Sequence, residues 1–397
     1  MTPAARVQTS IELLDAIIAA ARLKGAPADR ILADWFRNNR FAGSKDRRAI
    51  RELVFSAIRA CGPVPESGRA AMLRLAEVDN SIEPLFDGSN YGPAPLGEGD
   101  AAAAGGVAPQ WLDQRLRESD IAGPEADALL ERAPLDLRVN TLKADRATLE
   151  LPVQAALTDA PNGLRLEPGT PVEQWSAFRE GRFEVQDTGS QLACLAVAAK
   201  PGETIIDLCA GGGGKTLALA AAMDNLGRLI ASDTDRNRLS RLAPRAERAG
   251  ATNIEAVLLN PQAELEALAD LVGQADAVLI DAPCSGTGTW RRNPEARWRL
   301  DEKELARLTS VQSYLLDIAA KLVKPGGRIV YVTCSLLDEE GAGQFDAFLA
   351  RHTDVQPREL ALPLGRKRGK GIRLSPFHDG TDGFFIACAG GAQAQRA

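Results

Sequence analysis

Residues with catalytic potential recur after short apolar runs in the second half of the chain. These runs are rich in β-branched residues, which is typical of strands. The segments that follow them are Cys209-Ala210-Gly211-Gly212-Gly213-Gly214-Lys215, Asp233, Asn260, Asp281-Ala282-Pro283-Cys284 and Cys334-Ser335. Because ligands bind beyond the carboxyl ends of parallel strands, we expect these segments to meet at one edge of a sheet.

Besides the glycine-rich segment with Cys209, two of these segments contain a cysteine, Cys284 and Cys334, and Asp281 lies just before Cys284. Carbon 5 of a pyrimidine is a poor nucleophile, but a thiolate that adds to carbon 6 turns the ring into an enamine, which can attack an electrophilic methyl group. A carboxylate at the ring edge can bind the exocyclic amine or N3, which favours cytosine. This chemistry does not decide between Cys284 and Cys334 as the nucleophile. On spacing alone, the competing interpretation is that both thiols pack as small buried side chains.

The thiol that reacts needs a neighbouring positive charge, because a free thiol has a pKa of about 8.5. Lys215, Arg291 and Arg292 are the candidates for that charge. With only two histidines in the chain, a second thiol or a water is the expected helper in proton transfer.

The glycine run at 211–214 predicts close approach of the backbone to a ligand. A phosphate-binding loop would need a glycine where Cys209 stands, so an NTPase is disfavoured. Amides at a helix start favour an anion such as a carboxylate, and Asp233 lies about twenty residues further on, where it can accept hydrogen bonds from a ribose. Together they predict a nucleoside cofactor, against the alternative of a glycine-rich turn with a solvated aspartate.

Strands that alternate with helices are predicted to position these residues. The β-rich runs lie at 204–209, 228–232, 254–259, 277–280 and 328–333, and helical patterns lie at 215–223, 262–272 and 302–323. This alternation predicts βαβ units, and therefore an α/β fold with a mainly parallel sheet and helices on both faces.

The remaining sequence has a different pattern. Helical periodicity predicts an all-α domain at 1–78, and a Pro-, Gly- and Ala-rich stretch predicts a linker at 79–108. Helical patterns and an alternating run predict a helical plus small α+β (ferredoxin-like) unit at 109–190. The α/β domain is expected at 191–390, with a flexible tail at 391–397.

Composition excludes several classes of protein. Of the 397 residues, 45% are apolar and 25% are charged, as in ordinary globular proteins. No apolar run reaches the roughly 18 residues of a membrane span and no signal peptide is recognisable, so we expect a cytoplasmic protein without a membrane partner. The six cysteines form no C-x-x-C pair and histidines number only two, so neither disulfides nor a metal site is predicted.

The formal net charge of −6 argues against a protein that coats nucleic acid indiscriminately. Basic residues are nevertheless clustered in three segments, where they are candidates for phosphate contacts. These candidates are Arg37, Arg40, Lys45, Arg47, Arg48 and Arg51, then Arg291, Arg292, Arg297 and Arg299, and finally Arg366, Lys367, Arg368, Lys370 and Arg373. Trp290 and Trp298 are expected either to stack on a base or to pack in the core.

Several motifs occur in the order in which one enzyme family carries them. They are Val185-Gln-Asp-Thr-Gly-Ser-Gln, Asp207-Leu-Cys-Ala-Gly-Gly-Gly-Gly-Lys-Thr, Asp281-Ala-Pro-Cys-Ser-Gly-Thr-Gly-Thr-Trp-Arg-Arg-Asn-Pro-Glu, Val332-Thr-Cys-Ser and Asp382-Gly-Phe-Phe-Ile-Ala. Over about 130–390 the chain therefore resembles the RsmB/NSUN family of S-adenosylmethionine-dependent RNA cytosine-C5 methyltransferases. The N-terminal helices are similar to the NusB-like RNA-binding domain of bacterial RsmB proteins.

The resemblance implies a Rossmann-like class I methyltransferase domain with a seven-stranded sheet, and S-adenosylmethionine as the cofactor. It makes Cys334 the nucleophile and Cys284 the residue that assists product release, a choice that chemistry alone left open. The implied contacts to cofactor or target base come from Cys209, Ala210, Gly211, Gly212, Gly213, Gly214, Lys215, Asp233, Asn260 and Asp281. This chain departs from the family pattern around Gly211, where Ala-Pro is usual, and at Asn260, where an acidic residue is usual.

The leading hypothesis is an enzyme that methylates carbon 5 of cytidine in RNA, with 16S ribosomal RNA as the expected substrate and a monomer as the expected state. Alternative substrates are tRNA and 23S rRNA. A catalytically silent ribosome-assembly factor that binds RNA is the rival from another functional class. An amino-group methyltransferase is disfavoured, because it would need an aromatic residue in place of Cys284.

Overall fold

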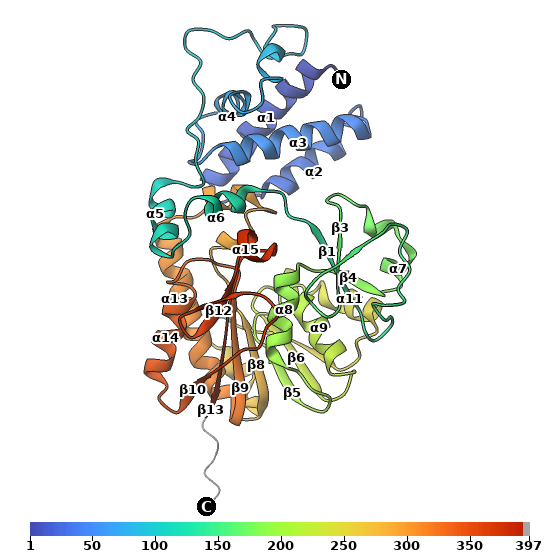
Figure 1. The fold of residues 1–397 in the computed structure, drawn as a ribbon, viewed down its shortest axis with the longest axis vertical. Coiled ribbons are helices and arrows are strands. Elements are labelled where there is room, and N and C mark those ends of the chain that lie inside the picture. Colours follow the sequence, from blue (N-terminus) through green and yellow to red (C-terminus); the bar gives the residue numbers. More distant parts are fainter. Residues whose placement is uncertain (392–397) are drawn as a thin grey trace, which may run out of the picture. The chain divides into compact units, whose positions relative to one another are not determined.

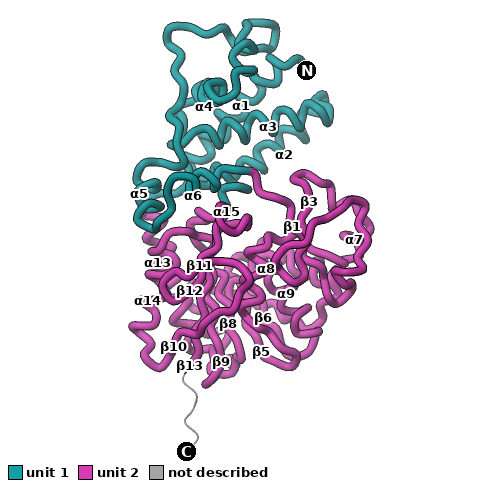
Figure 2. Tube along the Cα trace, in the orientation of Figure 1, with its two compact units in different colours: residues 1–131, 289–301 teal, residues 132–288, 302–397 magenta. Residues whose placement is uncertain are grey.

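The chain divides into two compact units in the computed structural model, which describes residues 1–391. Unit 1 comprises Met1–Glu131 and Thr289–Asp301, and unit 2 comprises Arg132–Gly288 and the chain from Glu302 onward (Figure 2). Of the tail expected at 391–397, Gly391 ends the last strand and the other residues lie outside the described part of the chain.

Amphipathic helices form the core of unit 1. They are α1 (Pro3–Arg22), α2 (Ala28–Asn38), α3 (Ser44–Ala60) and α4 (Gly68–Ala76) (Figure 1). The hydroxyls of Thr2 and Ser67 cap α1 and α4 by accepting hydrogen bonds from amides of the first turn. Leu14 and Ile17 of α1, and Val54 and Ile58 of α3, are three or four residues apart and fully buried, so burial of one apolar face stabilises each helix.

The stretch expected as a linker at 79–108 packs against these helices. Its only helical turn is η1 (Glu83–Leu85), yet Ile82 and Phe86 are buried in the core of unit 1. Arg69 of α4 donates a hydrogen bond of 2.6 Å to Asp100. The stretch is therefore irregular but held in place, and α5 (Gln110–Glu118) and α6 (Pro124–Asp127) that follow it also belong to unit 1.

A second piece of chain completes unit 1 from within the sequence expected to form the α/β domain. The segment Thr289–Asp301 contains the short helix η6 (Pro294–Trp298). Trp298 is 5% exposed and its indole donates a 3.2 Å hydrogen bond to the carbonyl oxygen of Gly62. This segment was expected in the domain at 191–390, but its apolar and polar contacts place it among the N-terminal helices.

Unit 2 begins with a small antiparallel sheet. Its strands are β1 (Leu135–Val139), β2 (Ala156–Leu157), β3 (Gly163–Leu166) and β4 (Phe183–Val185), in the order β2-β3-β1-β4. Leu137, Val139 and Phe183 are fully buried on one face, beside the short helix α7 (Ser176–Arg179).

The larger sheet of unit 2 has nine strands, in the order β11-β12-β13-β9-β8-β5-β6-β7, with β10 paired to β13. From β7 to β9 all neighbours are parallel, and β10 to β13 are added antiparallel. The strands are β5 (Thr204–Asp207), β6 (Arg228–Asp233), β7 (Ile254–Leu258), β8 (Ala275–Asp281), β9 (Val323–Thr333), β10 (Val355–Arg358), β11 (Arg366–Arg368), β12 (Gly371–Leu374) and β13 (Phe384–Gly391). The Rossmann-like architecture is confirmed, but the sheet exceeds the expected seven strands because β10 and β11 extend it.

Helices cover both faces of this sheet. Ile206 and Ile280 pack toward α13 (Glu302–Leu322) and α14 (Ala342–Arg351), whereas Ile205 and Leu279 pack toward α8 (Thr188–Val197) and α9 (Gly214–Ala222). The single helix expected over 262–272 is instead α12 (Glu264–Ala267) followed by the turn η4 (Ala269–Leu271). The remaining helices are α10 (Arg236–Leu239), α11 (Leu242–Ala249) and α15 (Pro376–Asp379). Among the described helices none is long and apolar enough to cross a membrane.

Candidate active site

The glycine run joins β5 to α9 in a tight loop. Gly213 has φ +83°, and a Cβ atom there would lie 2.2 Å from the Cδ1 atom of Leu242. Only glycine adopts this conformation without strain. Arg245 of α11 fixes the loop from outside, since its Nη1 donates a 2.5 Å hydrogen bond to the carbonyl oxygen of Gly212.

Asp233, at the end of β6, braces the same loop. Its Oδ2 accepts a 2.7 Å hydrogen bond from the amide of Gly211, and its Oδ1 accepts one of 2.7 Å from the amide of Asp235. The register of β6 and β7 pairs Asp233 with Leu258, so the exposed Asn260 follows at the same edge of the sheet. The two expected cofactor contacts on neighbouring strands therefore lie next to each other.

Asp207 is a buried carboxyl group that begins the glycine-rich motif and was not among the predicted site residues. Its Oδ2 accepts a 2.7 Å hydrogen bond from the hydroxyl of Thr216, and within the described structure its buried Oδ1 has no partner. Burial, assisted by the charges of Asp281 and Asp233, raises the pKa of Asp207 to about 7. The signal that could have revealed it is its position at the carboxyl end of β5.

Lys215 and Asp281 form an ion pair beside the glycine loop. Nζ of Lys215, the second residue of α9, lies 2.7 Å from Oδ2 of Asp281, the last residue of β8. Burial acts to lower the pKa of Lys215, but the charges of Asp281, Cys194 and Cys334 together raise it above its ordinary value. Lys215 is thus a positive charge that interacts electrostatically with Cys334.

The two predicted cysteines meet although 50 residues separate them. The Sγ atoms of Cys284 and Cys334 are 3.3 Å apart, and the two residues lie in the loops that follow the parallel strands β8 and β9. The hydrogen bond to Cys334, together with burial, raises the pKa of Cys284 well above its ordinary value. Cys284 therefore keeps its proton and can donate it toward Cys334. All six cysteines are free thiols.

A buried polar network holds the loops that carry these thiols. Glu340 is fully buried, and its carboxylate accepts hydrogen bonds from the amide and hydroxyl of Ser285 and from Nε2 of Gln312. The hydroxyl of Ser335 lies 3.2 Å from those of both Ser285 and Thr287. Sequence reasoning missed Glu340 and Gln312, because neither belongs to a motif with chemistry of its own.

The basic residues after Cys284 are placed differently from expectation. Arg297 is fully buried in unit 1, where its Nη2 donates hydrogen bonds of 2.7 and 2.6 Å to the carbonyl oxygens of Ile58 and Cys61. Burial lowers the pKa of Arg297 to about 9. Arg291 is 5% exposed, and Trp290 and Trp298 are also buried. These residues pack inside unit 1, so Arg291 and Arg297 are not retained as phosphate contacts and the tryptophans are not retained as stacking platforms.

The C-terminal basic residues lie on the hairpin formed by β11 and β12. Arg366 and Lys367 are exposed, whereas Arg368 forms an ion pair with Asp338, a residue of the loop after Cys334. Arg373 donates to the same carboxylate at 2.6 Å. Lys370 lies 3.5 Å from Asp346. Lys367 is thus open to solvent, while Arg368 and Arg373 fasten the hairpin to the Cys334 loop.

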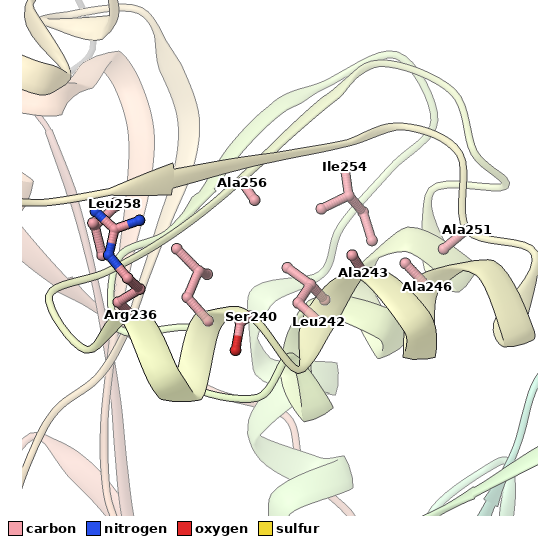
Figure 3. Close-up of a pocket in the computed structure, with 10 residues that line it drawn as sticks. Arg236, Ser240, Leu242, Ala243, Ala246, Ala251, Ile254, Ala256 and Leu258 are labelled. Carbon is pink, nitrogen blue, oxygen red and sulfur yellow. The ribbon is translucent and has the colours of Figure 1, made fainter.

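A pocket of about 320 Å³ opens between α10, α11 and β7, away from the thiols (Figure 3). Its lining is mainly apolar, and Figure 3 shows Leu242, Ala246 and Ile254 among the side chains that face it. None of the predicted site residues lines it. Within residues 1–391, no group of three or more His, Cys, Asp or Glu side chains is arranged to hold a metal ion.

Comparisons with known proteins match this architecture. The family model of the 16S rRNA methyltransferase RsmB/F matches residues 194–389. Ribosomal RNA small subunit methyltransferase B of Xylella fastidiosa (strain 9a5c) is 38% identical over 289 residues, which cover 70% of this chain and 67% of the relative. The probable enzyme of the same name from Synechocystis sp. is 37% identical over 299 residues, covering 70% of this chain and 66% of the relative. The chain thus spans about two thirds of the length of these relatives.

Solved structures share the fold. The crystal structure of PH0851 superposes with a TM-score of 0.75 at 26% identity and covers 98% of this chain and 99% of its own. A methyltransferase homologue from Pyrococcus horikoshii gives a TM-score of 0.59 at 26% identity, covering 71% of this chain and 99% of its own. NSun6 from Pyrococcus horikoshii with SFG gives a TM-score of 0.63 at 22% identity, covering 72% of this chain and 99% of its own. This similarity shows a shared fold alone.

Proposed function

The chain belongs to the RsmB/F family of 16S rRNA methyltransferases, and we propose that it methylates carbon 5 of cytidine in RNA through a covalent bond between Cys334 and carbon 6. One observation carries the proposal. The Sγ atoms of Cys284 and Cys334 lie 3.3 Å apart, and the Lys215–Asp281 ion pair stands beside them. A methyltransferase that modifies an amino group needs no thiol, whereas carbon 5 chemistry needs one to activate the ring.

Each residue has a role in this scheme. The Cys334 thiolate adds to carbon 6, and the electron pair of the C5–C6 double bond becomes available to attack a methyl group from carbon 5. Lys215 stabilises the thiolate, and the S–H of Cys284 donates toward the same sulfur. Oδ1 of Asp281 accepts from the exocyclic amine, while Oδ2 remains paired with Lys215. Loss of the carbon 5 proton to water then restores the double bond and expels Cys334 as it regains a proton.

S-adenosylmethionine fits the charges around the glycine loop and supplies the electrophilic methyl group when bound. Asp207, Asp233 and Asp281 surround the loop, and Oδ1 of Asp207 is a buried acceptor without a partner in the described structure. A ligand with ammonium and sulfonium charges would relieve this concentration of negative charge, whereas a nucleotide polyphosphate would be repelled by it. Gly211–Gly214, Asp233 and Asn260 are the residues that would hold its nucleoside and amino-acid parts.

The proposed substrate is 16S ribosomal RNA, because relatives that are more than a third identical carry the name ribosomal RNA small subunit methyltransferase B. The target base must leave its stack to reach a buried thiol. Bisulfite sequencing of ribosomal and transfer RNA tests both substrate and chemistry, in cells that lack the protein and are complemented with wild type, Cys334→Ala or Cys61→Ala. Cys61 is a matched control, since it is a buried thiol in unit 1.

We expect a 16S cytidine to lose its methyl group in the deletion strain and to regain it with wild type and Cys61→Ala, but not with Cys334→Ala. If cytidine methylation is lost only in tRNA or only in 23S rRNA, that RNA is the substrate instead. If no cytidine changes while ribosome assembly slows, the protein is a silent assembly factor and the proposal fails.

A further inference from the structure

Arg138, on β1 of the small sheet, is a buried cation with an unused hydrogen-bonding end. Its residue exposure is 5%, and its Nε donates a 2.6 Å hydrogen bond to Oε1 of Gln186. Among the described residues, neither of its Nη atoms has a hydrogen-bond partner. The two Nη atoms of this largely buried residue are therefore donors that an anionic ligand could complete.

The side chain lies on the face of the small sheet that is linked to the glycine loop through Glu184 and Arg245. Arg138 is paired with Glu184 across β1 and β4, so both side chains lie on the same face of the small sheet. Glu184 accepts a 2.8 Å hydrogen bond from Nη2 of Arg245, whose Nη1 donates to Gly212 of the glycine loop. On the other side, Nε2 of Gln186 lies 3.1 Å from the hydroxyl of Ser190 in α8. Arg138 is therefore connected to α8 through Gln186, and its neighbour Glu184 is connected to the glycine loop through Arg245.

The charge balance on this face favours an anion. Three arginines, Arg138 and the α11 residues Arg245 and Arg248, surround Glu184, and only the two of α11 form ion pairs with it. Glu184 already binds both arginines of α11, so it is not available to Arg138. The forked Nη pair of an arginine matches the two oxygens of a carboxylate. With 5% exposure, the site admits a small group more readily than a sugar–phosphate chain.

We infer that Arg138 binds the carboxylate of the amino-acid end of S-adenosylmethionine, an inference that rests on the proposed function. The negative and positive side chains around the glycine loop then bind different parts of the cofactor. Asp207, Asp233 and Asp281 face the cationic part of the cofactor, and Arg138 binds its anionic end. A ligand with both charges on one amino-acid group is thereby distinguished from a plain nucleoside.

Calorimetric binding of S-adenosylhomocysteine and of its decarboxylated analogue, which keeps the amine, tests this assignment. Arg138→Met should weaken binding of S-adenosylhomocysteine by roughly 10- to 100-fold and leave the analogue unchanged, because only one ligand has the carboxylate. Arg138→Lys should recover part of the loss. Arg182→Met is the matched control, since Arg182 is an exposed arginine of the same unit and should change neither affinity.

Unchanged binding of the analogue also shows that the variant is folded. Equal losses for both ligands, or no loss, would overturn the inference, and so would weaker RNA binding with normal cofactor binding, which would assign Arg138 to a phosphate. If Arg138→Met does not fold, wild type alone decides: equal affinities for the two ligands overturn the inference. Wild type that binds neither ligand would instead overturn the proposed function itself.

Discussion

Cys284 has a raised pKa, and its sulfur atom is in contact with that of Cys334. The hydrogen bond to Cys334 and burial hold the proton on Cys284, so Cys284 suits the role of a donor to a sulfur that carries negative charge. In the proposed mechanism, Cys334 carries such a charge twice, once before it attacks and once when it leaves. The pair therefore separates the nucleophile from the group that assists its departure.

We predict that Cys284→Ala accumulates a covalent protein–RNA adduct. Without the neighbouring S–H donor, Cys334 leaves carbon 6 more slowly, so the bond between them persists. A shifted band on a denaturing gel with substrate RNA and cofactor measures it, and the double variant Cys284→Ala/Cys334→Ala should show none. An adduct that forms in Cys334→Ala alone would reverse the two roles.

Asp207 makes stability depend on pH in the protein without cofactor. Its pKa is raised from 3.8 to about 7, so between these values the folded state holds a proton that the unfolded state has lost. The free energy of unfolding therefore falls as pH rises from about 4 to about 7, by at most about 4 kcal/mol. Denaturant unfolding at pH 5 and pH 8 should show a smaller difference for Asp207→Asn than for wild type. Asp270→Asn, an exposed control, should behave as wild type, and an unchanged pH dependence in Asp207→Asn would contradict the assignment.

At the scale of elements, the loop between β5 and α9 depends on one glycine more than on its neighbours. Gly213→Ala should lower the free energy of unfolding by about 1–2 kcal/mol, because the residue must keep a left-handed conformation. Its Cβ would also collide with Leu242, which is buried and has little room to move. Gly214→Ala is the matched control: a Cβ there meets nothing within 4 Å, and alanine favours the helix that begins at this position. Denaturant titration of both variants measures the difference, and equal stabilities would contradict this account of the loop.

The strand ends were predictable from sequence because their signal is local. Asp233, Asp281 and Cys334 each follow a β-rich run, and the parallel sheet brings such ends to one edge. Glu340 was not predictable, since its partners Ser285 and Gln312 lie far from it in sequence and carry no shared pattern. The two additional strands are short, and apolar periodicity marks neither: β10 has one aliphatic residue and a proline, and β11 consists of charged residues.

At the scale of the whole molecule, a net charge of −6 hides local basic surface that we expect to bind RNA. Lys367 is exposed on the β11–β12 hairpin, whereas Arg368 is occupied by Asp338. Lys367→Ala should reduce the slope of log affinity against log salt concentration by about 1, since each phosphate contact releases counterions. Fluorescence anisotropy with substrate RNA measures the slope. The control is Lys200→Ala, which changes an exposed lysine just before the N-terminal end of β5 and should leave the slope unchanged. Equal slopes for Lys367→Ala and wild type would show that the hairpin does not contact RNA phosphates.

The division of the chain into units was the least predictable feature. Arg297 and Trp298 read as a basic and aromatic loop beside Cys284, but their partners Ile58, Cys61 and Gly62 lie more than 200 positions earlier in the sequence. Sequence periodicity indicates which face of a helix is apolar, but it does not indicate which distant segment packs against that face.

This placement of Thr289–Asp301 also sets an order of events during synthesis. The helices α1 to α4 leave the ribosome first, yet the carbonyl groups at the end of α3 have no Arg297 to bind until residue 301 has been made. By then the strands β5 to β8 have already emerged. Unit 1, whose helices are translated first, therefore completes its core only after most of unit 2 has been synthesised. The last step in folding of unit 1 thus falls late in synthesis, when unit 2 can also fold.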